Sequence, residues 1–210
     1  MARVYVFVDG FNLYHALDRN KEYHKYKWLD LRALANCYVT SSENVSQVFY
    51  FTALANWDPN KVSRHQAYIK ALKTKNITTV LGKFKIVSRK CRAVCNLLGR
   101  DKVYETHEEK ETDVNIAIYL LEQAFLKHYD KAIIISGDSD LIPAIRAVRR
   151  LDASKEIRVV VPIGMNSIAI KKEANIAMRM KEEHLKTSLL PAFVSLPNGG
   201  SVSSPKEWLP

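Results

Sequence analysis

Short apolar runs alternate along this chain with segments whose apolar residues recur at helical spacing. Residues 3–8 are rich in β-branched and aromatic side chains and stop abruptly at Asp9-Gly10, which predicts a buried strand followed by a turn. Further strands are predicted at residues 45–52, 78–87, 132–136 and 157–162.

Helices are predicted between these strands. Asp58-Pro59 is typical of an N-cap followed by proline in the first helical turn. Thr112 is predicted to cap the clearest helix of the chain. Its periodic residues are Val114, Ala117, Ile118, Leu121 and Phe125. A later helix is predicted to begin at Ser139 or Asp140, with a buried stripe of Leu141, Ile145, Val148 and Leu151.

This alternation of strand and helix favours an α/β fold with a mostly parallel sheet covered by helices on both faces. The 210 residues fit one domain, predicted at residues 1–188. Residues 189–210 shift toward Pro, Gly and Ser and are interpreted as a tail, with Trp208 as a candidate anchor. The pattern leaves open whether the tail wraps around the domain or extends from it.

The charge balance favours an anionic partner. There are 32 Lys and Arg residues against 22 Asp and Glu residues, a formal charge of +10, which favours nucleic acid although it also aids solubility. No membrane partner is expected, because the longest apolar runs fall far short of the roughly 20 residues that a membrane helix needs. The sequence leaves the oligomeric state open, a homo-oligomer included.

The N-terminus and the cysteines favour the cytoplasm. Asp9 comes too early for the apolar region of a secretory signal. Three cysteines are too few and odd in number for a disulfide framework, so no disulfide partner is expected. Cys91 and Cys95 with His107 lack a fourth ligand for a structural zinc site, and a free cysteine pair is the simpler interpretation. Other histidines, such as His15 and His65, are expected at the surface or rim.

Candidate chemistry lies at the predicted strand ends. Asp9 follows one strand, and Asp138 and Asp140 follow another in the run Ser136-Gly137-Asp138-Ser139-Asp140. In a parallel sheet these positions share the edge where α/β proteins form their ligand crevices, and Asp113 could reach it from the first turn of its helix. Clustered carboxylates repel one another unless they bind a hard cation, and an all-oxygen set suits Mg²⁺ or Mn²⁺. The alternative for each aspartate is a backbone cap or turn.

Three short motifs together resemble the NYN domain of LabA-like proteins, a branch of the PIN-like nucleases. They are Val8-Asp9-Gly10-Phe11-Asn12, Lys110-Glu111-Thr112-Asp113-Val114 and Ser136-Gly137-Asp138-Ser139-Asp140-Leu141. Their order and spacing also fit, over roughly residues 3–180.

The resemblance implies a PIN-like three-layer α/β sandwich and Mg²⁺- or Mn²⁺-dependent hydrolysis of RNA. By that likeness Asp9, Asp113, Asp138 and Asp140 are the catalytic and metal-binding residues. Asn12 would orient the first carboxylate or contact substrate, although it could equally cap the helix predicted at residues 11–17. Glu111 is either a further member of the site or a solvated carboxylate of the acidic run at residues 108–111.

Basic residues between the first and second motifs could guide a phosphate backbone. A stretch interrupted by Phe84 and Tyr104 is either a substrate lane or a solvated strand edge and loop. The substrate-binding candidates are Lys85, Arg89, Arg92, Lys110 and, on a later helix, Arg146.

Two functions follow from these features. The first is a metal-dependent ribonuclease in which Asp113 or Glu111 acts as base. The second is a module that binds RNA or a protein without cutting. Dinucleotide oxidoreductases, phosphate-loop NTPases and serine hydrolases are disfavoured because their glycine-rich signatures do not occur.

Overall fold

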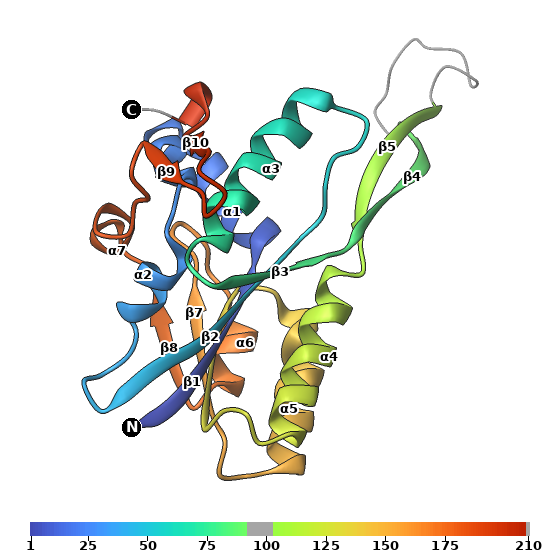
Figure 1. Cartoon of the computed structure of the whole chain (residues 1–210). Helices are drawn as coiled ribbons and strands as arrows, with labels where there is room; N and C mark the ends of the chain where they lie inside the picture. Colours follow the sequence, from blue (N-terminus) through green and yellow to red (C-terminus); the bar gives the residue numbers. More distant parts are fainter. Residues whose placement is uncertain (92–102, 209–210) are drawn as a thin grey trace.

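A single parallel sheet organises the molecule (Figure 1). The computed structural model describes residues 1–91 and 103–208. Six strands lie in the order β3-β2-β1-β6-β7-β8, and every neighbouring pair is parallel. The strands are β1 (Ala2–Asp9), β2 (Glu43–Thr52), β3 (Ile77–Leu81), β6 (Lys131–Ile135), β7 (Glu156–Val161) and β8 (Ile176–Arg179). The expected α/β class with a mostly parallel sheet is therefore confirmed.

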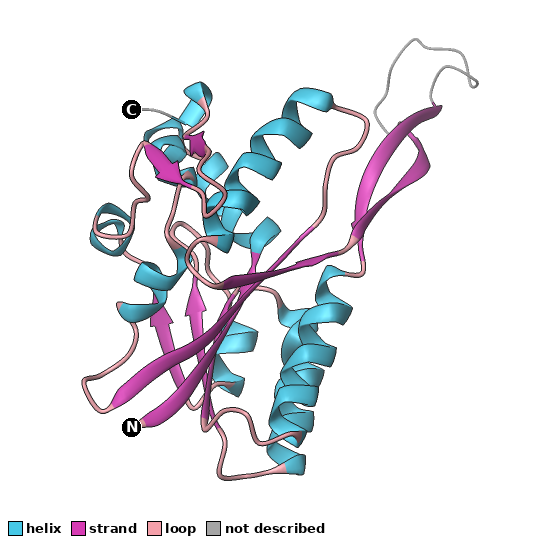
Figure 2. Ribbon diagram, viewed as in Figure 1, coloured by secondary structure: helices cyan, strands magenta, loops and turns pink. Residues whose placement is uncertain are grey.

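Helices cover both faces of this sheet (Figure 2). Along β1, Val4, Val6 and Val8 point into one core, while Phe7 points into the other, as the strand period of two requires. The first face carries α1 (Gly10–Asp18), η1 (Lys21–Lys27), α2 (Leu31–Asn36), α3 (Pro59–Lys73) and α7 (Glu182–Lys186). The second carries α4 (Thr112–Phe125), η3 (Ser139–Leu141), α5 (Ile142–Leu151) and α6 (Ile168–Glu173).

The strand order reverses between β1 and β6. From β1 the chain first builds β2 and β3 on one side, then returns to place β6 on the other side of β1. Ligands of open α/β sheets bind outside the carboxyl ends of the strands at such a reversal. The residues that follow β1 and β6 therefore lie where this fold favours a site.

The predicted helices are present, with corrections to their buried faces. Asp58 caps α3 by accepting the amides of Asn60 and Lys61, as predicted. In α4 the buried apolar residues are Ile116, Leu120 and Ala124, whereas Val114, Ile118 and Phe125 of the predicted set are exposed and its other two members are only partly buried. Residues of both faces are apolar, so periodicity located this helix without telling which face packs on the sheet. Thr112 is its first residue rather than its cap, which is Glu111. Leu151, expected in the buried stripe of α5, is 46% exposed.

The strand predicted at residues 78–87 is two strands divided at Gly82. Before it, β3 lies in the main sheet; after it, β4 (Lys83–Lys90) pairs with β5 (Val103–Lys110) in an antiparallel hairpin that extends away from the sheet (Figure 1). A Cβ at Gly82 would lie 2.6 Å from the Lys110 carbonyl and 2.9 Å from Thr112 Oγ1. The absence of a side chain therefore lets the start of β4 pass close to the end of β5.

The last residues contact the first face. β9 (Phe193–Ser195) and β10 (Ser201–Ser203) form a small antiparallel pair that buries Val194. In η4 (Lys206–Trp208), the Trp208 ring lies 6.0 Å from that of Tyr68 and 6.4 Å from that of Trp28, centroid to centroid. A domain boundary at residue 188 stays a prediction. In the part of the chain described, no helix is both long and apolar enough to cross a membrane.

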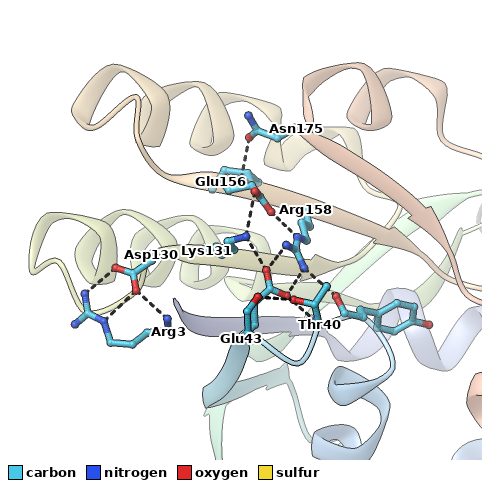
Figure 3. A network of polar contacts seen from close by, with 11 residues as sticks. Arg3, Thr40, Glu43, Asp130, Lys131, Glu156, Arg158 and Asn175 are labelled. Atoms are coloured by element: carbon cyan, nitrogen blue, oxygen red, sulfur yellow. Dashed lines mark hydrogen bonds and ion pairs between the residues drawn. The ribbon is translucent and has the colours of Figure 1, made fainter. Parts of the chain in front are cut away.

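A buried ionic network joins the amino-terminal ends of the strands, at the opposite end of the sheet from the candidate site (Figure 3). Glu43, at the start of β2, pairs with Arg158 of β7 and with Lys131 of β6. Arg158 also bonds Glu156 and the Tyr38 carbonyl. These cations lower the pKa of Glu43 to about 2, Arg158 contributing most. This network ties the strand beginnings together, away from the strand ends that carry the candidate site.

Candidate functional site

Asp9 is fixed at the centre of the candidate site. It ends β1, is 3% exposed and caps α1 by accepting the Asn12 amide on Oδ1 at 2.9 Å. Its other oxygen accepts a hydrogen bond of 2.8 Å from the hydroxyl of Ser136, which follows β6. Gly10 allows the tight exit from β1, because a Cβ there would lie 2.5 Å from the Phe51 carbonyl. The cap and the site are thus the same carboxylate.

Asn12 links the two halves of the site. Its side-chain oxygen accepts the Gly137 amide at 2.8 Å, which joins α1 to the loop after β6. This hydrogen bond gives an asparagine at position 12 a structural role that needs no substrate, because its side-chain oxygen reaches the loop on the other side of the strand reversal. A substrate contact by Asn12 stays a prediction.

Asp138 and Asp140 lie on the loop after β6, next to Asp9. Ser136 Oγ accepts the Asp138 amide at 3.0 Å while it donates to Asp9, so one hydroxyl sets both positions. Asp138 Oδ1 in turn accepts the Asp140 amide at 2.9 Å and caps η3. Asp138 is partly exposed and Asp140 is exposed. The expected turn after a buried strand is therefore present, with both carboxylates at its surface.

Asp113 approaches from α4. The preceding Glu111 has a φ of 78°, a left-handed backbone that is uncommon outside glycine and turns β5 sharply into α4. Thr112 follows, 1% exposed, with its hydroxyl unpaired among the described residues. Its amide donates 2.9 Å to Glu109 Oε1. This entry holds Asp113 in the first turn of α4, half-buried.

Electrostatics couple these carboxylates. The pKa of Asp9 is raised to about 6, mainly by burial and further by the charges of Asp138 and Glu109. The pKa of Asp113 is also raised to about 6, again mainly by burial and then by Asp9, Asp138, Glu109 and Asp140. Repulsion of this kind means that all four predicted aspartates share one electrostatic environment.

Glu109 is a member of the group that the sequence interpretation missed. It opposes Phe84 in the hairpin and raises the pKa of both Asp9 and Asp113. Strand alternation in the acidic run could have singled out Glu109 in the sequence. Glu109 and His107 share one face of β5, while Glu108 and Lys110 share the other. Glu111, considered in its place, is bound to Lys83 in an ion pair.

The donor chemistry fits a hard divalent cation. Carboxylate oxygens are the ligands preferred by Mg²⁺ and Mn²⁺, and Mg²⁺ keeps several waters and so needs few direct protein ligands. Within residues 1–91 and 103–208, no three His, Cys, Asp or Glu side chains converge closely enough to hold an ion directly. Metal binding by Asp9, Asp113, Asp138 and Asp140 therefore stays a prediction.

The predicted substrate-binding cations lie on two different surfaces. On the hairpin, Lys85 stands opposite Glu108 in β5. Both Arg89 and Lys110 form ion pairs with that same Glu108, the latter at 3.0 Å. Arg146, on α5, is bound by Glu173 at 2.6 Å. Four predicted cations therefore stand near an acid, and substrate binding by them stays a prediction.

Two predictions concern residues between β4 and β5. Arg92 and Cys95 lie outside the described residues, whereas Cys91 is partly buried and forms no disulfide with the other described cysteine. His107, the third zinc candidate, stacks on the Trp57 indole with ring centroids 3.6 Å apart and an angle of 13° between the planes.

A cavity that the sequence did not indicate lies at the start of α1. It has a volume of about 430 Å³ and lies between α1, α3, the base of β4 and η4. Gly10 and Phe11, which directly follow Asp9, form part of its wall. His65 also lines it, half-buried, and burial lowers the pKa of this imidazole to about 4. The start of α1 thus links the cavity to Asp9, while none of the four predicted aspartates is among the lining residues.

Comparison with known families and solved structures agrees with the fold. The profile of the NYN domain family matches residues 3–179, nearly the whole sheet and its helices. A crystal structure of a protein of unknown function from Vibrio parahaemolyticus is similar with a TM-score of 0.57 at 17% identity, covering 90% of this chain and 96% of that one. That similarity supports the three-layer fold alone.

One relative is named as a monooxygenase. The 6-hydroxy-3-succinoylpyridine 3-monooxygenase HspA of Pseudomonas putida is 24% identical over 242 residues, an alignment that covers 98% of this chain and 75% of the relative.

Proposed function

Because this chain belongs to the NYN domain family, we propose that it is a divalent-metal-dependent nuclease that hydrolyses phosphodiester bonds in RNA. The observation that supports the proposal is the raised pKa, about 6, of both Asp9 and Asp113, caused first by burial and then by the charges of neighbouring carboxylates, Asp138 among them. Such uncompensated negative charge is stabilised when a cation binds.

Each carboxylate would have a distinct part. Asp9, fixed by Ser136 and the Asn12 amide, is the rigid ligand, while Asp138 and Asp140 at the surface are open to solvent and substrate. When bound, Mg²⁺ or Mn²⁺ would lower the pKa of a water and neutralise charge on the phosphate. Asp113 would accept the proton from the attacking water, a role that its pKa of about 6 suits.

RNA as the substrate is supported by charge and by the family. The formal charge of +10 coexists with a carboxylate cluster, so cations elsewhere must meet the phosphate backbone. We further propose that the protein is cytoplasmic and that the basic face of β4, with Lys85 and Arg89, contacts the strand.

Cleavage of a labelled single-stranded RNA by the purified chain tests this proposal. Fragments are expected with Mn²⁺ or Mg²⁺ and none with a chelator. Cleavage that persists in chelator would overturn it. RNA that binds with steep salt dependence but stays intact across divalent metals would instead establish a non-catalytic binding module.

The relative and the cavity favour a second candidate, oxygenation of a small heteroaromatic compound. The cavity beside Asp9 is of ligand size and largely aromatic, and the relative is named for oxygenation of a pyridine. Incubation with 6-hydroxy-3-succinoylpyridine, dioxygen and a reductant tests this candidate. Oxygen uptake with a product heavier by one oxygen atom would support it, and unchanged substrate would remove it.

A further inference from the structure

The cavity beside the carboxylates has the walls of a ring-binding site. Aromatic side chains from separate parts of the chain line it, among them Phe11 and Tyr14 of α1, Trp57 before α3, Phe84 of β4 and Trp208 of η4. Trp57 and Phe84 meet edge to face with centroids 4.6 Å apart, and Phe84 meets Phe11 in the same way at 5.4 Å. Edges and faces arranged like this offer surfaces on which a planar ring can stack.

The inner part of the cavity is polar. Thr52, which is 1% exposed, and Tyr50 both bond His65 Nε2, at 3.1 and 3.3 Å. Burial keeps this imidazole neutral near pH 7, so it can donate or accept a hydrogen bond. These groups already bond one another, and their remaining hydrogen-bonding capacity can be used by a ring with nitrogen or oxygen atoms but not by a purely hydrocarbon ligand.

One cation of the lining could exchange its partner for an anion. Lys27, Lys61 and Arg64 are the cationic lining residues and Asp18 is the acidic one. Lys27 is bound to Asp18, and Arg64 to Glu207. Lys61 is 56% exposed and lies 3.5 Å from Asp58, whose other oxygen already accepts two backbone amides of α3. Lys61 is therefore the cation best placed to exchange its partner for a ligand anion.

We propose that this cavity binds a planar heteroaromatic ring that carries an anionic group, with the ring against Trp57 and Phe84 and the anion at Lys61. Two sources share this chemistry. One is a nucleotide of the strand held at the carboxylates, an assignment that rests on the proposed function. The other is a free heteroaromatic acid. Because Phe11 lies two residues after Asp9 and Phe84 opposes Glu109, a nucleotide whose phosphate is at Lys61 would have its ring in the part of the cavity nearest the carboxylates.

Calorimetric titration of the full chain in chelator tests the proposal without any requirement for cleavage. The probes are adenosine 5′-monophosphate and nicotinate, with ribose 5-phosphate as the ring-free control. Trp57→Ala should weaken binding of the ring probe about tenfold, the loss typical of one stacking partner. Lys61→Gln should weaken it severalfold. The matched controls, Phe125→Ala on α4 and Lys70→Gln on α3, lie outside the cavity and should bind as the wild type does.

The outcomes separate the two sources and the two proposals. Binding of the nucleotide that is lost in Trp57→Ala supports the nucleotide assignment, and it should survive in Asp138→Asn, which removes a carboxylate but no cavity wall. Binding of nicotinate alone supports the cavity and assigns it to a small acid. Failure of both probes at millimolar concentration, or binding that Trp57→Ala leaves unchanged, overturns the proposal whether or not the protein cleaves RNA.

Discussion

The Ser136 hydroxyl donates a hydrogen bond of 2.8 Å to the carboxylate of Asp9, joining the ends of β6 and β1 across the strand reversal. Because the same hydroxyl accepts the Asp138 amide, a change at either strand end affects the positions of both Asp9 and Asp138. The charge gathered at this junction has consequences for stability as well as for chemistry.

Asp9 is expected to reduce stability at neutral pH. Its pKa rises from 3.8 to about 6 in the folded protein, so ionisation opposes folding as the pH rises from 4 to 6 and by a constant amount above 6. We compare the unfolding free energy of Asp9→Asn with that of the wild type at each pH. Between pH 4 and pH 8 this difference should shift in favour of the variant by up to about 3 kcal/mol. Urea unfolding of both proteins at the two pH values measures this. An equal difference at both pH values would show that folding does not oppose the ionisation of Asp9.

Divalent metal should relieve the same repulsion. A ligand that binds only the folded state at a hundredfold excess over Kd adds about 2.7 kcal/mol of stability. Thermal unfolding with Mn²⁺ should shift upward in the wild type and much less in Asp138→Asn, whereas Asp152→Asn, at the far end of α5, should shift like the wild type. Equal shifts in all three proteins would place the metal elsewhere.

Gly82 should be required for the placement of Glu109 and Asp113. A methyl group there would meet the Lys110 carbonyl at 2.6 Å, and backbone cannot yield as a flexible side chain does. Gly82→Ala is expected to cost about 1–3 kcal/mol in unfolding free energy and to lower cleavage. Gly200→Ala, whose nearest contact would be 3.5 Å away, is the control and should change neither. A stable, fully active Gly82→Ala protein would contradict this explanation.

The Glu43 network should matter for stability alone. The pKa of Glu43 falls from 4.5 to about 2 in the folded protein. Its ion pairs therefore contribute fully to stability above pH 4.5, and this contribution is lost as the pH falls through 2. Glu43→Gln leaves Arg158 buried without its main partner and should cost about 3 kcal/mol at pH 7, a deficit that shrinks toward pH 2. Cleavage per folded molecule should stay unchanged. Loss of cleavage without loss of stability would link this edge to the site.

The sequence predicted the parts of the site that depend on local order. Asp9 and Asp138 were found because each follows a buried apolar run, and Asp113 because its motif accompanies theirs. Glu109 was missed because its direction depends on the hairpin register, which Gly82 permits by letting backbones approach. The cavity was missed for a similar reason. Its walls come from residues as distant as Phe11 and Trp208, which only the folded chain brings together.

Cleavage of RNA by matched aspartate variants tests the central claim most directly. Rates of single-turnover cleavage with Mn²⁺ are measured for the wild type, Asp9→Asn, Asp138→Asn and the distant control Asp152→Asn, with folding checked for each. The account predicts that Asp9→Asn and Asp138→Asn each lose about a hundredfold or more in rate while Asp152→Asn keeps the wild-type rate. Wild-type rates in folded Asp9→Asn and Asp138→Asn would contradict a nuclease site at these carboxylates.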